Sequence, residues 1–100
     1  MKIDKGGKQM KINEQTGIVT INRTEYHLTK NEIKTLKGLL KKKMVTPADI
    51  YEEIYRVRPV KMSNYDKRLV YISIGRLKRK IPGLIVNRYY GFGYELGGIE

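Results

Sequence analysis

One stretch of this 100-residue chain, residues 63–81, limits the possible folds more than any other. Four aliphatic residues in it recur at spacings of four, three and four, which places them in one narrow stripe of a helix with 3.6 residues per turn. The members of this stripe are Val70, Ile74, Leu77 and Ile81. Ser63 and Asp66 resemble a capping box at the start, and Pro82 followed by Gly83 ends the helix. The sequence therefore predicts a helix with one buried stripe.

The opposite face of this helix is strongly basic. From Asp66 to Lys80 there are six basic residues and one acid. Exposed helix faces usually mix both signs, because ion pairs three or four residues apart stabilise a helix. Gly75 also lies on this face, where glycine costs roughly 1 kcal/mol relative to alanine. A basic face interrupted by a glycine favours close approach by a nucleic-acid groove over an ordinary solvated face.

The overall charge supports a polyanionic partner. The formal net charge is +11 and the pI is near 9.9. Nucleic acid is the first candidate, an anionic membrane surface the second and an acidic protein the third. A helix on a membrane surface needs a broad exposed apolar face, whereas the apolar stripes of this chain are narrow. No run of residues approaches the roughly 20 apolar positions of a membrane span, and the first residues lack the apolar segment of a signal peptide. We therefore expect a cytoplasmic protein without a membrane partner.

The residue types exclude most catalytic and metal chemistry. There is no cysteine, which excludes disulfides and thiolate metal sites, and the single histidine is His27. No nucleophile–base pair, metal-ligand set or phosphate loop can be assembled from the sequence. We therefore predict that the protein is not an enzyme and needs no cofactor, and we assign His27 no functional role.

The N-terminal third predicts a tail and a small sheet. Residues 1–8 are polar and basic, which predicts a flexible basic tail ahead of one domain over residues 9–100. Residues 9–13 alternate apolar and polar side chains, and residues 18–21 are β-branched throughout. A third short strand is predicted at residues 25–28, so these segments form a small antiparallel sheet.

Two shorter helices follow the sheet. Thr29 and Glu32 form a capping box before the first, whose predicted apolar stripe is Ile33, Leu36, Leu40 and Met44. This stripe predicts that Gly38 faces outward, and the sequence gives no reason for a glycine there. The lysines of this helix are expected to be solvated or to cap its last turn. The second helix starts at Thr46 and Pro47 and carries three acids, which makes it a poor candidate to face DNA.

The chain ends with a predicted hairpin. Residues 84–90 and 94–96 read as two strands around a turn at residues 91–93. Four polar or aromatic residues lie near its tip: Asn87, Arg88, Tyr89 and Tyr90. Basic and aromatic side chains at a hairpin tip suit a minor groove or a nucleic-acid backbone. The alternative for the tyrosines is that the hairpin only closes the sheet.

A sheet, three helices and a hairpin are the elements of a winged helix-turn-helix, and four motifs resemble the OmpR/PhoB-type effector domains of response regulators. Leu28-Thr29-x-x-Glu32 resembles the family's L-T-x-x-E, and residues 50–55 (IYEEIY) resemble its L-L-E-x-V-W. Residues 68–81 are similar to the recognition-helix pattern R-x-V-D-V-H-I-x-R-L-R-x-K-L, and residues 88–94 to the wing signature T-V-R-G-x-G-Y. Tyr71, Ser73 and Tyr90 depart from this pattern. The family's effector domain usually follows a receiver domain, which these 100 residues do not include, so we expect either a stand-alone protein or the effector domain of a longer one.

The resemblance implies an α+β winged helix-turn-helix that binds double-stranded DNA selectively and regulates transcription. Its recognition helix would enter the major groove and its wing the minor groove. The recognition-helix residues are Lys67, Arg68, Tyr71, Ile72, Gly75, Arg76, Lys78, Arg79 and Lys80, and the wing residues are Asn87, Arg88, Tyr89 and Tyr90. The resemblance also implies a homodimer on tandem direct repeats. The expected protein partner is RNA polymerase for a role in transcription, or a relaxase for a role in plasmid transfer.

Two other functions remain open from the sequence. The first keeps DNA as the partner, as an accessory protein of a plasmid or other mobile element that binds a transfer origin, within a relaxosome, or a partition site. The sequence does not separate this role in conjugation from transcription. The second is a protein-interaction module whose charge is incidental.

Overall fold

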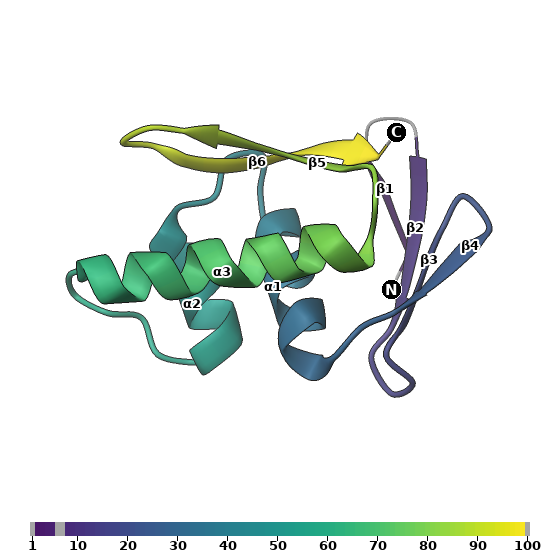
Figure 1. Cartoon of the computed structure of the whole chain (residues 1–100), viewed down its shortest axis with the longest axis horizontal. Coiled ribbons are helices and arrows are strands. Elements are labelled where there is room, and N and C mark those ends of the chain that lie inside the picture. The colour runs from purple at the N-terminus through teal and green to yellow at the C-terminus, as the bar shows by residue number, and fades with distance from the viewer. Residues whose placement is uncertain (1, 6–7, 100) are drawn as a thin grey trace.

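The computed structural model of this protein describes residues 2–5 and 8–99 (Figure 1). A small sheet, three helices and a hairpin follow one another in the predicted α+β order. The elements are β1 (Lys2–Lys5), β2 (Lys8–Asn13), β3 (Ile18–Ile21), β4 (Thr24–His27), α1 (Lys30–Leu40), α2 (Pro47–Tyr55), α3 (Asn64–Lys80), β5 (Leu84–Tyr89) and β6 (Gly93–Ile99). The N-terminal sheet lies at one end of the helices, and the β5–β6 hairpin runs along α3 (Figure 1).

The N-terminal sheet has one strand more than the sequence predicts. Its order is β1-β2-β3-β4, and β1 pairs antiparallel with β2, with Lys2 opposite Lys11. The structure thus has a strand within residues 1–8, where the sequence predicts a flexible tail. Polar composition misses this strand because pairing satisfies the backbone groups along the free edge of β2, whatever the side chains are. Met1, Gly6 and Gly7 of the predicted tail lie outside the described residues.

The three helices begin where the sequence places their caps. Thr29, Thr46 and Ser63 each accept a hydrogen bond from the backbone N–H three residues later, and the acid at that position reaches back to the cap. The predicted stripe of α3 is confirmed, since Val70, Ile74, Leu77 and Ile81 are all buried. α3 therefore presents a fixed opposite face to solvent.

The inward face of α1 is turned from the predicted one. Leu39 is fully buried, whereas Met44 is 37% exposed and lies beyond the helix, which ends at Leu40. Gly38 is buried against α2, where an added Cβ would lie 3.2 Å from the Cα of Ile50. The prediction that Gly38 faces outward is therefore wrong, because this glycine lets the two helices approach closely.

The hairpin is held to the helices at its inner strand. Val45, in the α1–α2 connection, and Tyr94 in β6 exchange two backbone N–H···O hydrogen bonds of 2.9 and 2.7 Å. Gly93 lies beside this contact with a φ of 146°, and an added Cβ would clash with the carbonyl oxygen of Val45. Only glycine fits there. β6 also runs further than predicted, pairing Ile99 with Leu84.

Candidate nucleic-acid interface

The predicted recognition residues line the solvent side of α3. Because Val70, Ile74 and Leu77 fix the buried side, the residues between them turn outward. The exposed ones are Lys67, Arg68, Tyr71, Ile72, Arg76, Lys78, Arg79 and Lys80. Gly75 is half-buried, and an added Cβ there would meet nothing within 4 Å. Nothing in the described fold therefore demands a glycine at this position.

Most cations of this face form no ion pair among the described residues. Within residues 2–5 and 8–99, five of them form no ion pair: Lys67, Arg68, Arg76, Lys78 and Arg79. Lys80 differs, since its Nζ lies 3.5 Å from Oε1 of Glu32, the acid of the α1 capping box. The positive charge of α3 is therefore concentrated away from Lys80.

A groove separates α3 from the hairpin. It is an open hollow of about 480 Å³ that both elements line. Its walls include six residues predicted as site residues: Tyr71, Ile72, Gly75, Lys78, Arg79 and Arg88. The structure thus brings the helix and the wing of the predicted site together around one concave surface.

Arg76 lies on the other flank of α3. With Ser73 it lines a hollow of about 260 Å³ that is closed by Tyr55 and by the start of α1. Ile72 lines both this hollow and the groove beside the hairpin, so it stands on the ridge between them. Ser73 turns its hydroxyl to its own helix and donates a 2.9 Å hydrogen bond to the carbonyl of Leu69.

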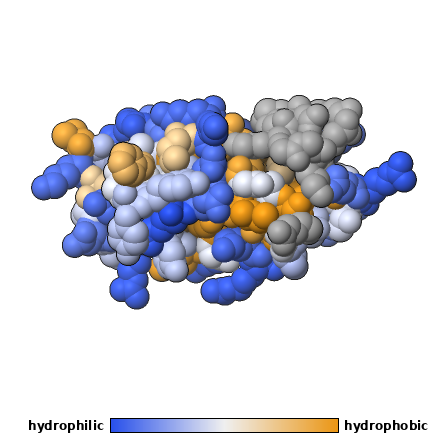
Figure 2. Space-filling view, turned by 90° about the horizontal axis from the view of Figure 1, so that it is seen from above, coloured by the Kyte–Doolittle hydropathy of each residue, from blue (hydrophilic) through white to orange (hydrophobic). Residues whose placement is uncertain are grey.

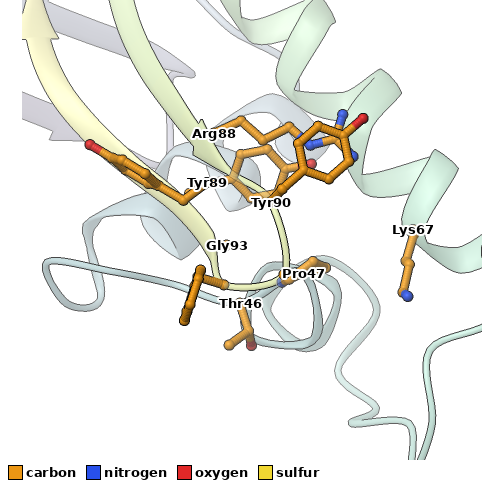
Figure 3. A pocket seen from close by; sticks show the side chains of 10 residues that line it. Thr46, Pro47, Lys67, Arg88, Tyr89, Tyr90 and Gly93 are labelled. Carbon is orange, nitrogen blue, oxygen red and sulfur yellow. The ribbon is translucent and has the colours of Figure 1, made fainter.

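Arg88 packs between two tyrosines from different elements. Its guanidinium lies 5.4 Å from the ring centroid of Tyr71 in α3 and 4.9 Å from that of Tyr90 at the hairpin turn. Figure 3 shows Arg88 and Tyr90 side by side, both directed toward the helix that carries Lys67. Cation–π contacts of this kind tie the wing to α3.

The other predicted wing residues point elsewhere. Tyr89 lies on the opposite side of the hairpin from Tyr90 (Figure 3) and donates a 3.1 Å hydrogen bond to Glu95. That hydrogen bond, together with the negative charge of Glu95, raises the pKa of the Tyr89 hydroxyl. Asn87 is exposed and pairs across the hairpin with Glu95. Of the four wing residues, Arg88 and Tyr90 are therefore the ones that face α3.

Sequence reasoning missed Phe92 at the hairpin turn. Its side chain is 73% exposed, and it lines a hollow of about 380 Å³ with Lys67 and with Thr46 and Pro47 at the start of α2. The signal was present, since this single phenylalanine of the chain stands between Gly91 and Gly93 in a predicted turn. A turn that exposes an aromatic ring is a candidate contact surface.

The acids of α2 lie in ion pairs. Asp49 contacts Arg58 at 2.8 Å and Lys42 at 3.3 Å, and Glu53 contacts Lys41 at 3.3 Å. Burial by itself raises the pKa of the Asp49 carboxyl, but hydrogen bonds from Thr46 and Arg58 outweigh it and hold this pKa well below its usual value. Asp49 is therefore ionised and fixed.

The described residues contain no cluster suited to a metal ion, meaning three or more histidine, cysteine, aspartate or glutamate side chains together. Among the same residues no helix has the length and apolar character needed to cross a membrane.

Comparison with known proteins identifies the fold. No protein-family model and no curated protein matches the sequence. The structure is similar to that of the DNA-binding domain of the response regulator AdeR, solved in complex with an intercistronic region, with a TM-score of 0.69 and 18% identity. The match covers 97% of this chain and 99% of the AdeR chain. The chain has a winged-helix fold. The predicted fold class, and the resemblance to this type of effector domain, are thus confirmed at the level of the fold.

Proposed function

We propose that this protein binds double-stranded DNA with sequence selectivity and regulates transcription, with α3 in the major groove and the β5–β6 turn at the neighbouring minor groove. The observation that carries the proposal is a row of cations along α3 that form no ion pair within the described residues, beside a groove that the hairpin also lines. The AdeR domain, whose fold the chain shares, was solved with an intercistronic region, which supports the same use of the fold.

The dimensions of α3 suit a major groove. It has 17 residues, which corresponds to roughly 25 Å of helix, and the major groove is about 12 Å wide and admits one helix. Ile72 stands on the ridge of the exposed face, where it meets the floor of the groove first. An isoleucine there suits the methyl group of thymine, and Arg76 and Arg79 on either side suit guanine.

Gly75 shapes the same surface. It lies one turn along from Ile72, and the space beyond it is open. A side chain there would stand between α3 and the bases. Its absence lowers the outer surface of the helix in the middle of the basic face, so the helix can lie deeper in the groove.

The remaining predicted residues are assigned by charge and position. Lys67, Arg68 and Lys78 neutralise phosphates, and Arg88 holds the wing against α3. From the family resemblance we further propose that two copies bind tandem direct repeats head to tail. Sedimentation of the protein on a duplex with one or two half-sites tests this stoichiometry.

The test of DNA binding is selection from a random duplex library at about 150 mM salt, where counterion release has already weakened non-specific contacts. Two variants with the same change in net charge accompany the wild type. One carries Arg68→Gln, Arg76→Gln and Arg79→Gln on α3, and the other carries Lys37→Gln, Lys41→Gln and Lys42→Gln on and after α1. Circular dichroism checks that both variants are folded.

We expect the wild type and the α1 variant to enrich the same half-site, and the α3 variant to enrich none. The slope of log affinity against log salt should flatten by about 0.9 for each phosphate that the variant no longer neutralises. Equal weakening in both variants would mean that net charge alone drives binding and would contradict the assignment of α3. Absence of binding by the wild type would refute the function and direct attention to protein partners.

A further inference from the structure

The hairpin turn exposes two aromatic rings to solvent. Tyr90 is 85% exposed and Phe92 73% exposed. Figure 2 views the molecule from the hairpin side and shows hydrophobic atoms standing out among hydrophilic ones at the end where Figure 1 places the turn. An apolar ring gains free energy when it leaves water, so rings held at a tip favour contact with a partner surface.

The turn is presented rigidly. The N–H of Phe92 donates a 3.0 Å hydrogen bond to the carbonyl of Tyr89, which closes the turn. Immediately after it, Gly93 packs against Val45, and Tyr94 is hydrogen-bonded to Val45 in both directions. The tip therefore projects from an anchored base.

The cation nearest the tip does not project from it. From Asn87 to Phe92 the one basic residue is Arg88, and its guanidinium packs between the rings of Tyr71 and Tyr90. A wing that reads a minor groove by charge leads with an arginine. Here the leading groups are aromatic rings.

We propose that Phe92, backed by Tyr90, is an apolar wedge that enters the minor groove of the bound duplex, partly unstacks one base step and kinks the DNA. This inference rests on the proposed function. Aromatic and aliphatic side chains inserted between base steps open the minor groove and bend the duplex by roughly 20–90°. Pyrimidine–purine steps unstack most easily, so the wing would select such a step without hydrogen-bonding its bases.

The charges around the tip favour DNA as the partner of these rings. Lys67 lines the same hollow as Phe92, and the cations of α3 that form no ion pair in the described part of the chain lie on the neighbouring face. An apolar protein partner would have no counterpart for these charges, whereas a minor groove offers phosphates beside an apolar interior.

The experiment measures the bend of a selected duplex by energy transfer between dyes at its two ends, with saturating protein. Wild-type protein should shorten the end-to-end distance. Phe92→Ala should abolish most of the bend while changing affinity by less than about tenfold. Phe92→Leu should retain the bend, because leucine also acts as a wedge. Val60→Ala serves as the matched control, since Val60 is a fully exposed apolar residue of the α2–α3 connection and should leave the bend unchanged.

Duplexes with 2-aminopurine at successive adenine positions give a second readout. Its fluorescence rises when a base unstacks, and we expect the rise at one step next to the half-site with wild type and Phe92→Leu only. Binding without any bend, or a full bend with Phe92→Ala, would overturn the wedge and leave DNA binding intact. Dissociation of a free-protein dimer by Phe92→Ala would assign the ring to a second copy and also overturn it. Failure of the wild type to bind any duplex would overturn the proposed function instead.

Discussion

Two lysine- and arginine-rich surfaces of this protein differ in what their cations contact. On and after α1, Lys37 lies 3.1 Å from Glu14, Lys41 3.3 Å from Glu53, and Lys42 3.3 Å from Asp49. On α3, five cations have no acidic partner among the described residues. The two surfaces do not differ in how many basic residues they carry. They differ in ion pairing, because acids on neighbouring segments neutralise the lysines on and after α1, whereas the surface of α3 stays positive.

This difference supports the different roles that we propose for the two surfaces. Exposed ion pairs contribute about 0–1 kcal/mol each to folding, so the lysines of α1 give α2 modest support. Screening limits charge interactions to about 8 Å at physiological salt. A DNA phosphate therefore responds to the local balance of charge, and the local balance favours α3.

The largest expected effect is on DNA affinity. Arg76→Ala should weaken binding of the selected site by about 5- to 150-fold, equivalent to about 1–3 kcal/mol, and should relax base preference at one position. Lys37→Ala is its counterpart on the other surface and should leave the affinity unchanged. Fluorescence anisotropy with matched and mismatched duplexes measures both. If Lys37→Ala weakened binding as much as Arg76→Ala, the division between the two surfaces would be wrong.

The next effect is on stability. Asp49→Ala removes the capping-box acid of α2 together with its contacts to Arg58 and Lys42, and should lower the free energy of unfolding by about 1–2 kcal/mol. Urea unfolding at pH 7 measures this change. DNA affinity at a temperature where the variant is folded should be unchanged, since the ion pairs of Asp49 are with Lys42 and Arg58, neither of which belongs to α3. A loss of affinity in the folded variant would show that the two surfaces are coupled.

The same carboxyl predicts a dependence on pH. The pKa of Asp49 is lower in the folded state than the usual value near 3.9 for an unfolded chain. Its stabilising contribution is therefore fully present above that value and is lost as the pH falls below it. The difference in stability between wild type and Asp49→Ala should shrink as the pH is lowered from 5 to 2. A difference that stayed constant would mean that the ionised carboxyl is not the cause.

The smallest effect compares two lysines of α3. Lys78 has no acidic partner among the described residues, whereas Lys80 lies 3.5 Å from Glu32. Lys78→Ala should flatten the slope of log affinity against log salt by about 0.9, and Lys80→Ala by less. Titrations between 50 and 200 mM salt distinguish them. Equal slopes would mean that Lys80 leaves Glu32 when DNA binds.

Structural features that depend on residues close together in the sequence were predictable from it. The three capping boxes and the stripe of α3 depend on residues three or four positions apart, so local spacing reveals them. The contact of Gly38 with Ile50 and that of Gly93 with Val45 join residues that are distant in the chain. No local pattern encodes them. The same holds for β1, which owes its structure to the edge of β2.

In the predicted site, too, local spacing predicted which residues are exposed, whereas contacts between distant residues could not be predicted. The helical periodicity correctly predicted that the cations of α3 face solvent. It could not predict which of them would form an ion pair with an acid. The pairing of Lys80 with Glu32 and the packing of Arg88 between Tyr71 and Tyr90 arise from helix and hairpin packing. Phe92 was missed because a predicted turn at residues 91–93 does not by itself show which side chain the turn exposes.

The anchoring of the hairpin at Val45 and Tyr94 has a consequence for how such a protein can change its target. Arg88 holds the wing on one side of the tip and Gly93 and Tyr94 hold it on the other, and the exposed rings of Tyr90 and Phe92 lie between them in the chain. The exposed tip of the hairpin can therefore accept substitutions while the base of the hairpin stays anchored to the helices. Under the proposed function, substitutions at the tip would change what the wing recognises without altering its position relative to α3, so the DNA contacts of the wing and of α3 would diversify independently.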